Sequence, residues 1–209
     1  MMQKTFSKAD ILNLSKEYRR NLINSVGGFK SLALVGTIDR EGQTNLSLIS
    51  SIIHVGANPP LLGMLMRPHV VPRHTIENIE ATHHFTVNHV REEFYTLAHQ
   101  TSARYPKEVS EFRATGLTEE FSEMHPAPYV LESSVRMGLR FVERHHVTAN
   151  ATQLIIGEII ELSVPSIGLK EDGFVDLESL GTLTVSGLDS YHKTQRLGRL
   201  PYAKADSKP

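Results

Sequence analysis

The hydrophobic positions near the start of the chain have the spacing of an amphipathic helix. Ser7 and Asp10 have the spacing of a helix start, and the apolar residues that follow, from Ile11 to Leu22, recur every three or four positions. The pair Gly27 and Gly28 ends this pattern. The sequence therefore predicts one N-terminal helix, and we expect its apolar side to pack on the edge of the domain.

Beyond this helix, runs of strand-forming residues dominate. Residues 31–38 and 43–53 are two such runs, and the Gly-containing loop 39–42 between them predicts a β-hairpin. Six further strands are predicted farther along the chain. They are residues 61–66, 85–90, 129–131, 135–147, 152–164 and 181–185.

Helical patterns interrupt the strands in one place. Residues 92–104 read as an amphipathic helix, and residues 106–112 read as a short second one. The second half of the chain lacks the regular alternation of helix and strand that a doubly wound parallel sheet needs. We therefore predict a mainly β, α+β barrel with flanking helices. Its domains would be an N-terminal helix over 1–25, one barrel domain over 26–204 and a tail over 205–209, with basic and aromatic residues rather than a strand over 187–200.

Composition narrows the possible functions. The chain has 209 residues, of which 40% are hydrophobic, enough for one domain with a full core. Its net charge of −1 gives no general field for nucleic acid or anionic lipid, so any anion must be bound locally. The absence of cysteine excludes disulfides, thiolate catalysis and cysteine-ligated metal sites. Without a secretion signal or a long apolar run, we expect a soluble cytoplasmic protein with no membrane partner.

A candidate anion site lies where the chain leaves Pro72. Arg73, His74 and Thr75 open a predicted helix there, and Asn78 follows in its first turn. Helix starts carry partial positive charge and free N–H donors, and a nearby arginine makes such a place suitable for phosphate. Arg67, six residues before Arg73, could close on the same anion. The alternative is that Thr75 only caps the helix and the arginines are solvated.

A second candidate region is the polar strand that precedes it. Asn45, Ser47, Ser50 and Ser51 interrupt what would otherwise be an apolar run. Buried polar side chains need partners, and a flat heteroaromatic ring with carbonyl and ring-nitrogen acceptors would supply them. The alternative, serines facing solvent at every second position, explains Ser47 and Ser51 but not Ser50.

The order of these motifs resembles the flavin reductase-like, FMN-binding split-barrel family. The resemblance covers roughly residues 25–204. It is carried by 45–51, by Asn58-Pro59-Pro60, by Arg73-His74-Thr75 with Asn78-Ile79, by Phe85-Thr86-Val87-Asn88, by Gly157-Glu158 and by the closing segment 187–204.

The resemblance implies a six-stranded antiparallel split barrel, non-covalent FMN and a homodimer with the flavin near the subunit interface. It also implies that Asn45, Ser47, Ser50 and Ser51 line the isoalloxazine ring. Arg73, His74, Thr75 and Asn78 would hold the ribityl phosphate. Weaker candidates are Arg67 and the segment from Tyr191 to Arg196, which would reach across the dimer.

The chain departs from the family pattern in two places. Asn58 and His74 stand where an acid is usual, which relieves repulsion next to a phosphate. Many members that use NAD(P)H carry a histidine shortly before the Gly-Glu strand end, whereas this chain has Thr152 and Gln153. The use of NAD(P)H as a partner is therefore open.

Other chemistries are weaker hypotheses. The adjacent pairs His83–His84 and His145–His146 fall on predicted strands, so their side chains point to opposite faces and chelate one metal poorly. The motifs of zinc peptidases and of serine hydrolases are absent.

The leading hypothesis is an FMN-dependent oxidoreductase that passes hydride or electrons through bound flavin to a small acceptor, a flavin or oxygen. Hydride transfer requires no acid or base from the protein, so no catalytic residue is named. The alternatives are a non-catalytic flavin carrier or sensor and, less favoured, a metal-dependent hydrolase.

Overall fold

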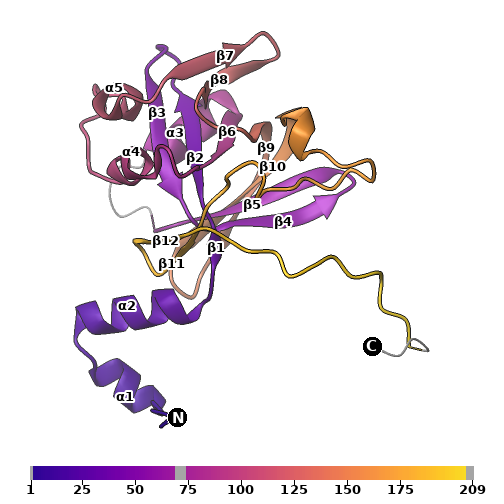
Figure 1. Cartoon of the computed structure of the whole chain (residues 1–209). Helices are drawn as coiled ribbons and strands as arrows, with labels where there is room; N and C mark the ends of the chain where they lie inside the picture. The colour runs from indigo at the N-terminus through magenta and orange to yellow at the C-terminus, as the bar shows by residue number, and fades with distance from the viewer. Residues whose placement is uncertain (1, 69–73, 206–209) are drawn as a thin grey trace.

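The computed structural model describes residues 2–68 and 74–205. Its main element is an antiparallel sheet of seven strands in the order β3-β2-β6-β9-β10-β5-β4 (Figure 1). These strands are β2 Ala33–Ile38, β3 Thr44–Ile49, β4 Ile52–Ala57, β5 Pro60–Met66, β6 His84–His89, β9 Arg136–Val147 and β10 Thr152–Ser163.

Two smaller sheets and several helices surround this sheet. One small sheet joins β1 (Lys30–Ser31), β11 (Thr184–Ser186) and β12 (Ser190–His192), and the other is the pair β7 (Glu119–Ser122) and β8 (His125–Val130). The helices of the body are α3 His74–Thr82, α4 Tyr95–Gln100, α5 Glu111–Thr115 and the short 3-10 helix η1 Ser166–Gly168.

The sheet separates two hydrophobic cores. The larger one fills the inside of the barrel, where Val35, Phe85 and Ile155 pack against Ile76 and Ile79 of α3. The second core lies on the opposite face of β2 and β3. It is built by Leu32, Leu34, Leu46, Val90, Phe94, Ala98, Phe112, Leu117, Val130, Leu183 and Val185, which includes residues of α4 and α5.

β8 packs closely on β2 where the two elements cross. A Cβ added to Gly36 would lie 2.2 Å from the carbonyl oxygen of Pro128, so only glycine allows this approach. Thr86 of β6 donates to the same carbonyl at 2.6 Å. The β7–β8 pair is thereby fixed on the outside of β2 and β6.

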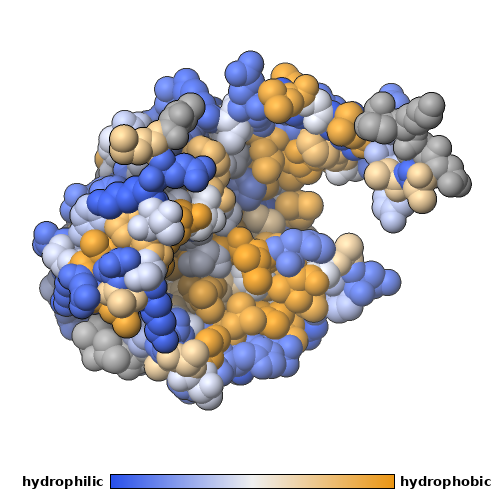
Figure 2. Space-filling model, turned by 90° about the horizontal axis from the view of Figure 1, so that it is seen from below, coloured by the Kyte–Doolittle hydropathy of each residue, from blue (hydrophilic) through white to orange (hydrophobic). Residues whose placement is uncertain are grey.

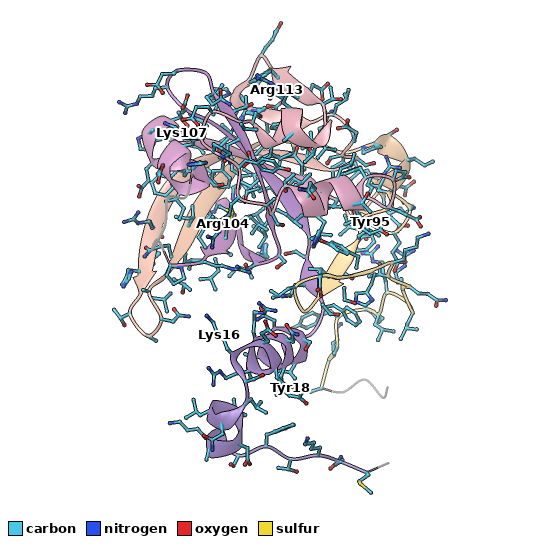
Figure 3. The ribbon with its side chains drawn as sticks, turned by 90° about the vertical axis from the view of Figure 1, so that its left-hand side faces the viewer. Lys16, Tyr18, Tyr95, Arg104, Lys107 and Arg113 are labelled. Atoms are coloured by element: carbon cyan, nitrogen blue, oxygen red, sulfur yellow. The ribbon has the colours of Figure 1, made fainter. Side chains whose placement is uncertain are left out.

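The N-terminus forms an arm that leaves the body. α1 (Lys8–Asn13) and α2 (Lys16–Val26) contain no buried residue. Figures 1 and 3 show them below the sheets, with Lys16 and Tyr18 at the opposite end of the molecule from Arg113. Tyr18 and Val26 are 50% and 70% exposed, so the apolar side of the arm is uncovered within one chain.

The predicted antiparallel split barrel is confirmed, and several element predictions need correction. The expected single N-terminal helix is two helices, because Ser15 caps a new helix by accepting from the Tyr18 N–H. It also does not pack on the domain's edge. The expected strand 43–53 is β3 and β4, which pair with different partners. The helix expected over 92–104 is the shorter α4, and the last segment does contain a strand, β12.

Among residues 2–68 and 74–205, no helix combines the length and the apolar character needed to cross a membrane.

Candidate functional site

Four polar side chains meet inside the barrel at the start of α3. Asn45 Nδ2 donates to Thr37 Oγ1 at 3.2 Å and to Thr75 Oγ1 at 3.1 Å. Asn78 Nδ2 donates to the same Thr37 oxygen at 3.2 Å. All four residues are buried. The predicted residues Asn45, Thr75 and Asn78 are thus brought together, and the start of α3 is fixed on β3.

Thr37 is the member of this cluster that the sequence analysis missed. It lies on β2 directly opposite Asn45 in the β2–β3 pairing, so both side chains point to the same face. Its hydroxyl accepts from two amides, which joins β2, β3 and α3. A polar residue facing a polar residue across the predicted hairpin was the available signal.

β3 lies at the end of the main sheet, and α5 covers part of its free edge. The Leu46 N–H donates to Glu111 Oε2 at 2.9 Å. Two residues earlier, Thr44 Oγ1 shares a hydrogen bond of 2.8 Å with Ser110 Oγ. Antiparallel edge strands point every second N–H outward, so Leu48 directs its N–H to the same side as Leu46. α5 thus occupies one end of this edge.

Glu111 is a buried carboxylate with an unusual environment. Burial raises the pKa of Glu111, and this effect outweighs the Leu46 N–H, its own backbone N–H and the positive charge of His74, which lower it. His74 is the first residue of α3. The carboxylate therefore lies within electrostatic reach of the predicted phosphate site.

The serines of the predicted ring site lie at the other end of β3. Ser47 shares a face of β3 with Asn45, whereas Ser50 and Ser51 form the turn into β4, and all three are partly buried. Ser51 Oγ donates to the Leu65 carbonyl at 3.1 Å, and the Leu65 N–H donates back to the Ser51 carbonyl at 2.9 Å. The turn is thereby tied to the last residues of β5, which lead to Arg67.

Arg67 is exposed and lies close to another cation. Burial and then the charge of Arg67 lower the pKa of Lys30, whose Nζ donates to the Gly187 carbonyl at 2.6 Å. This contact brings the β11–β12 hairpin to the same end of the barrel as Arg67. On that hairpin, Tyr191 Oη hydrogen-bonds His99 Nδ1 at 2.5 Å, and its ring lies 5.3 Å from that of Tyr95.

A pocket of about 430 Å³ lies beside Tyr191. Tyr95 and Tyr191 contribute aromatic walls, and the ion pair of Glu92 with Lys193 crosses its rim at 2.5 Å. A second pocket of about 320 Å³ shares Glu92 and Lys193. Figure 3 shows Tyr95 on this side of the molecule, and Arg104 on the segment that links α4 to α5.

Two predicted site residues are not joined to this arrangement. Arg196 Nη2 donates to Asp176 Oδ2 at 3.3 Å, and its guanidinium lies 5.8 Å from the ring centre of Phe174. Within one chain it therefore braces the segment before β11. Arg73 lies outside the described residues. Both assignments stay predictions.

The remaining predicted residues follow β3 and the turn after it. Asn45, next to Thr75 on α3, and Ser51, which is bonded to β5 near Arg67, are six positions apart in the chain. At about 3.3 Å per residue this separation is at most roughly 20 Å. The arrangement offers a helix start at one end and serines at the other, as an elongated ligand with a phosphate and a flat polar ring would require.

Next to Thr152, the first residue of β10, lies a buried glutamine. Gln153 is 8% exposed, and its amide hydrogen-bonds His146 Nδ1 at 2.7 Å. Its Oε1 is buried and has no hydrogen-bond partner. Gln153 pairs with Met66 of β5, next to Arg67, so it lies at the ring end of the site.

Among residues 2–68 and 74–205, no group of three or more His, Asp or Glu side chains has the geometry to hold a metal ion. The site described here is therefore built from hydrogen-bonding groups and cations.

Comparison with known proteins assigns this chain to a class. Residues 29–178 match the family described as the flavin reductase like domain. The chain belongs to this family, and its class is that of the flavin-related oxidoreductases.

Individual relatives agree with this assignment. A split-barrel structure from Shewanella frigidimarina NCIMB 400, provisionally named a flavin reductase, is 50% identical, with a TM-score of 0.93 over 96% of this chain and 100% of that one. Nitrilotriacetate monooxygenase component B from Bacillus cereus is 21% identical, with a TM-score of 0.81 over 96% and 100% of the two chains, and shows the same fold. An uncharacterized protein of Aquifex aeolicus (strain VF5) is 29% identical over 84% of each chain.

Proposed function

We propose that the protein is an FMN-dependent oxidoreductase that passes electrons through bound flavin to a small acceptor, a flavin or oxygen. The observation that carries this proposal is the hydrogen-bonded contact between β3 and the start of α3, in which Asn45 donates to Thr75 at 3.1 Å. It puts the predicted ring strand and the predicted phosphate site next to each other in the fold. FMN, when bound, would supply the hydride and electron chemistry.

The chemistry of the donor set fits FMN. The Thr75 hydroxyl accepts from Asn45 in the structure, which leaves its own hydrogen free to donate to a phosphate oxygen. The first N–H groups of α3 and the charges of Arg67, Arg73 and His74 would complete the phosphate contacts. Ser47, Ser50 and the outward N–H groups of β3 would donate to the ring, and Ser51, whose hydroxyl donates to the Leu65 carbonyl, would line it. The hydrogen bonds that Thr75 and Asn78 make to Asn45 and Thr37 position the helix.

A homodimer is the second part of this proposal. Ile53 and Val55 of β4 and Leu65 of β5 are 53%, 42% and 40% exposed, and Ile53, Val55 and Leu154 converge over Gly63 on the outer face of the sheet. We call these four apolar side chains, Ile53, Val55, Leu65 and Leu154, the β4–β5 face. Seen from below, Figure 2 shows a broad apolar surface on the side of the molecule from which the N-terminal arm extends. A second copy of the chain would cover both the β4–β5 face and this apolar surface.

The cofactor part of the proposal is tested by titrating the flavin-free protein with FMN and with riboflavin. Charged hydrogen bonds to phosphate contribute about 1.5–3 kcal/mol each, so Arg67→Ala and His74→Ala should each weaken FMN by roughly tenfold or more and leave riboflavin nearly unchanged. The control is Arg140→Ala, which removes an exposed arginine of β9 that forms an ion pair with Glu158 of β10. Equal losses for both flavins would remove the phosphate assignment.

Thr152 and the buried Gln153 favour a second candidate function, a flavin carrier or sensor without turnover of its own. They stand where many NAD(P)H-using members of the family carry a histidine, so the nicotinamide contact can be missing. Stopped-flow mixing of the FMN-loaded protein with NADH and NADPH separates the two candidates. Bleaching of the flavin absorbance supports the reductase. A flavin that stays oxidised with both donors but is reduced by dithionite supports the carrier.

That this reaction takes place in the cytoplasm stays a prediction.

A further inference from the structure

Glu111 links three elements at the phosphate end of the proposed flavin site. It is the first residue of α5 and is 7% exposed. Its Oε2 accepts the outward Leu46 N–H of β3 at 2.9 Å, and His74 at the start of α3 acts on its charge. A neutral side chain could fix β3 equally well, so the hydrogen bond alone does not explain a buried acid at this position.

Two further charged residues belong to the elements around Glu111. Glu119 on β7 accepts from Thr44 and Ser110, and Arg113 on α5 itself is exposed. His74 is the group whose charge lowers the pKa of Glu111, whereas burial raises it. Glu111 is thus a buried acid within electrostatic reach of the start of α3, whose own first turn carries a second acid, Glu77.

A phosphate bound at the same helix start would be a second anion in a poorly solvated region. Two like charges held close together disfavour the ionised form of both groups. The phosphate would gain hydrogen bonds from the helix N–H groups and the cations, and these favour its ionised form. At the buried carboxyl, burial already outweighs the Leu46 N–H and the charge of His74, so a proton from solvent is what removes the repulsion.

We propose that Glu111 is a proton-linked positioning residue, which fixes β3 through the Leu46 N–H and takes up one proton from solvent when a phosphate-bearing flavin binds at the start of α3. This inference rests on the proposed function. It predicts that FMN affinity changes with pH more steeply than riboflavin affinity does. The limit for one linked proton is about tenfold per pH unit.

The test is calorimetric titration of the flavin-free protein in two buffers with different ionisation heats, at about pH 5.5 to 6.5, above the ordinary pKa of glutamate. The slope of binding heat against buffer heat gives the number of protons taken up. With FMN, the wild-type protein should take up more protons than Glu111→Gln, by roughly half a proton. The variant keeps an acceptor for the Leu46 N–H and shares any titration of the phosphate itself. Glu119→Gln, the neighbouring acid, should behave as wild type.

Equal proton numbers for the wild type and Glu111→Gln overturn the inference, and so does a difference that riboflavin reproduces. If neither flavin binds, the binding isotherm shows this before any proton is counted, and the proposed function fails together with the inference. If Glu111→Gln does not fold, infrared difference spectra of the wild type decide. A protonated-carboxyl band should appear on adding FMN but not riboflavin, and its absence overturns the inference.

Discussion

The hydroxyl of Thr37 joins the buried side chains at the proposed phosphate site. Its Oγ1 accepts from both Asn45 and Asn78 in a buried cluster. Thr37→Val keeps the shape but leaves both amide donors without this acceptor, so the free energy of unfolding should fall by about 1–3 kcal/mol. Urea denaturation measures it. Thr152→Val, which removes an exposed hydroxyl bonded to Asn150, should change it far less.

If Thr37→Val is as stable as the wild type, water or a rearranged amide satisfies these donors, and the cluster does not fix α3.

A partly buried histidine at the end of β6 predicts how stability responds to acid. Burial lowers the pKa of His89 from 6.5 to about 4. Between these values the unfolded chain binds a proton that the folded chain does not, so stability falls as the pH drops from 6.5 towards 4. His89→Gln should therefore reduce the stability lost between about pH 7.5 and 4.5, by roughly 1–3 kcal/mol.

Denaturation curves at both pH values give this difference for His89→Gln and for His145→Gln. His145 is an exposed histidine on β9, and its replacement should leave the acid dependence unchanged. A His89 variant with the same acid dependence as the wild type would show that His89 is hydrated in solution.

The sequence marked individual residues of the buried polar cluster better than their partners. Asn45 stood out because it interrupts an apolar strand, and Thr75 and Asn78 stood out because they fall at a predicted helix start. Thr37 and Glu111 did not, since their roles come from contacts made across the fold. Glu111 lies 65 positions from Leu46, and no local pattern marks a carboxylate that will be buried against a distant strand.

At the scale of elements, the long strands were predictable and the short ones were not. β9 and β10 carry long strand patterns and were predicted to within a few residues. β7 and β12 have four and three residues, and their pairing partners rather than their own sequence stabilise them. Residues 43–53 look like one strand, but Ser51 turns towards Leu65, so two strands form with different partners.

The β-bulge on β10 gives a prediction at this scale. A Cβ on Gly157 would lie 2.5 Å from Cζ of Phe85, a ring that is 2% exposed, so the ring or the strand must move. Gly157→Ala should lower the free energy of unfolding by about 1–3 kcal/mol, with a lower Tm. Gly198→Ala is the control, because nothing lies within 4 Å of its Cβ position. Equal Tm values for the two variants would mean that the bulge adapts at no cost.

At the scale of the whole molecule, one chain leaves apolar surface that a stable protein would be expected to cover. α1 and α2 bury none of their residues, and the β4–β5 face adds exposed aliphatic side chains on the sheet. β5 ends near Arg67, and its neighbour Ser51 belongs to the proposed ring site. A partner on this face would therefore lie beside the flavin, so the proposed dimer and flavin binding should depend on each other.

Val55→Asp tests this dependence. An aspartate on the β4–β5 face would have to bury its charge at the proposed interface, a cost that should shift the protein from dimer to monomer and weaken FMN by several-fold. Sedimentation velocity measures the first effect and fluorescence titration the second. Ile167→Asp places the same charge on η1, at a residue that is 79% exposed but outside this face, and should change neither. A Val55→Asp protein that stays dimeric would place the subunit contact elsewhere. A monomer that binds FMN as tightly as the wild type would instead show that each site is complete within one chain.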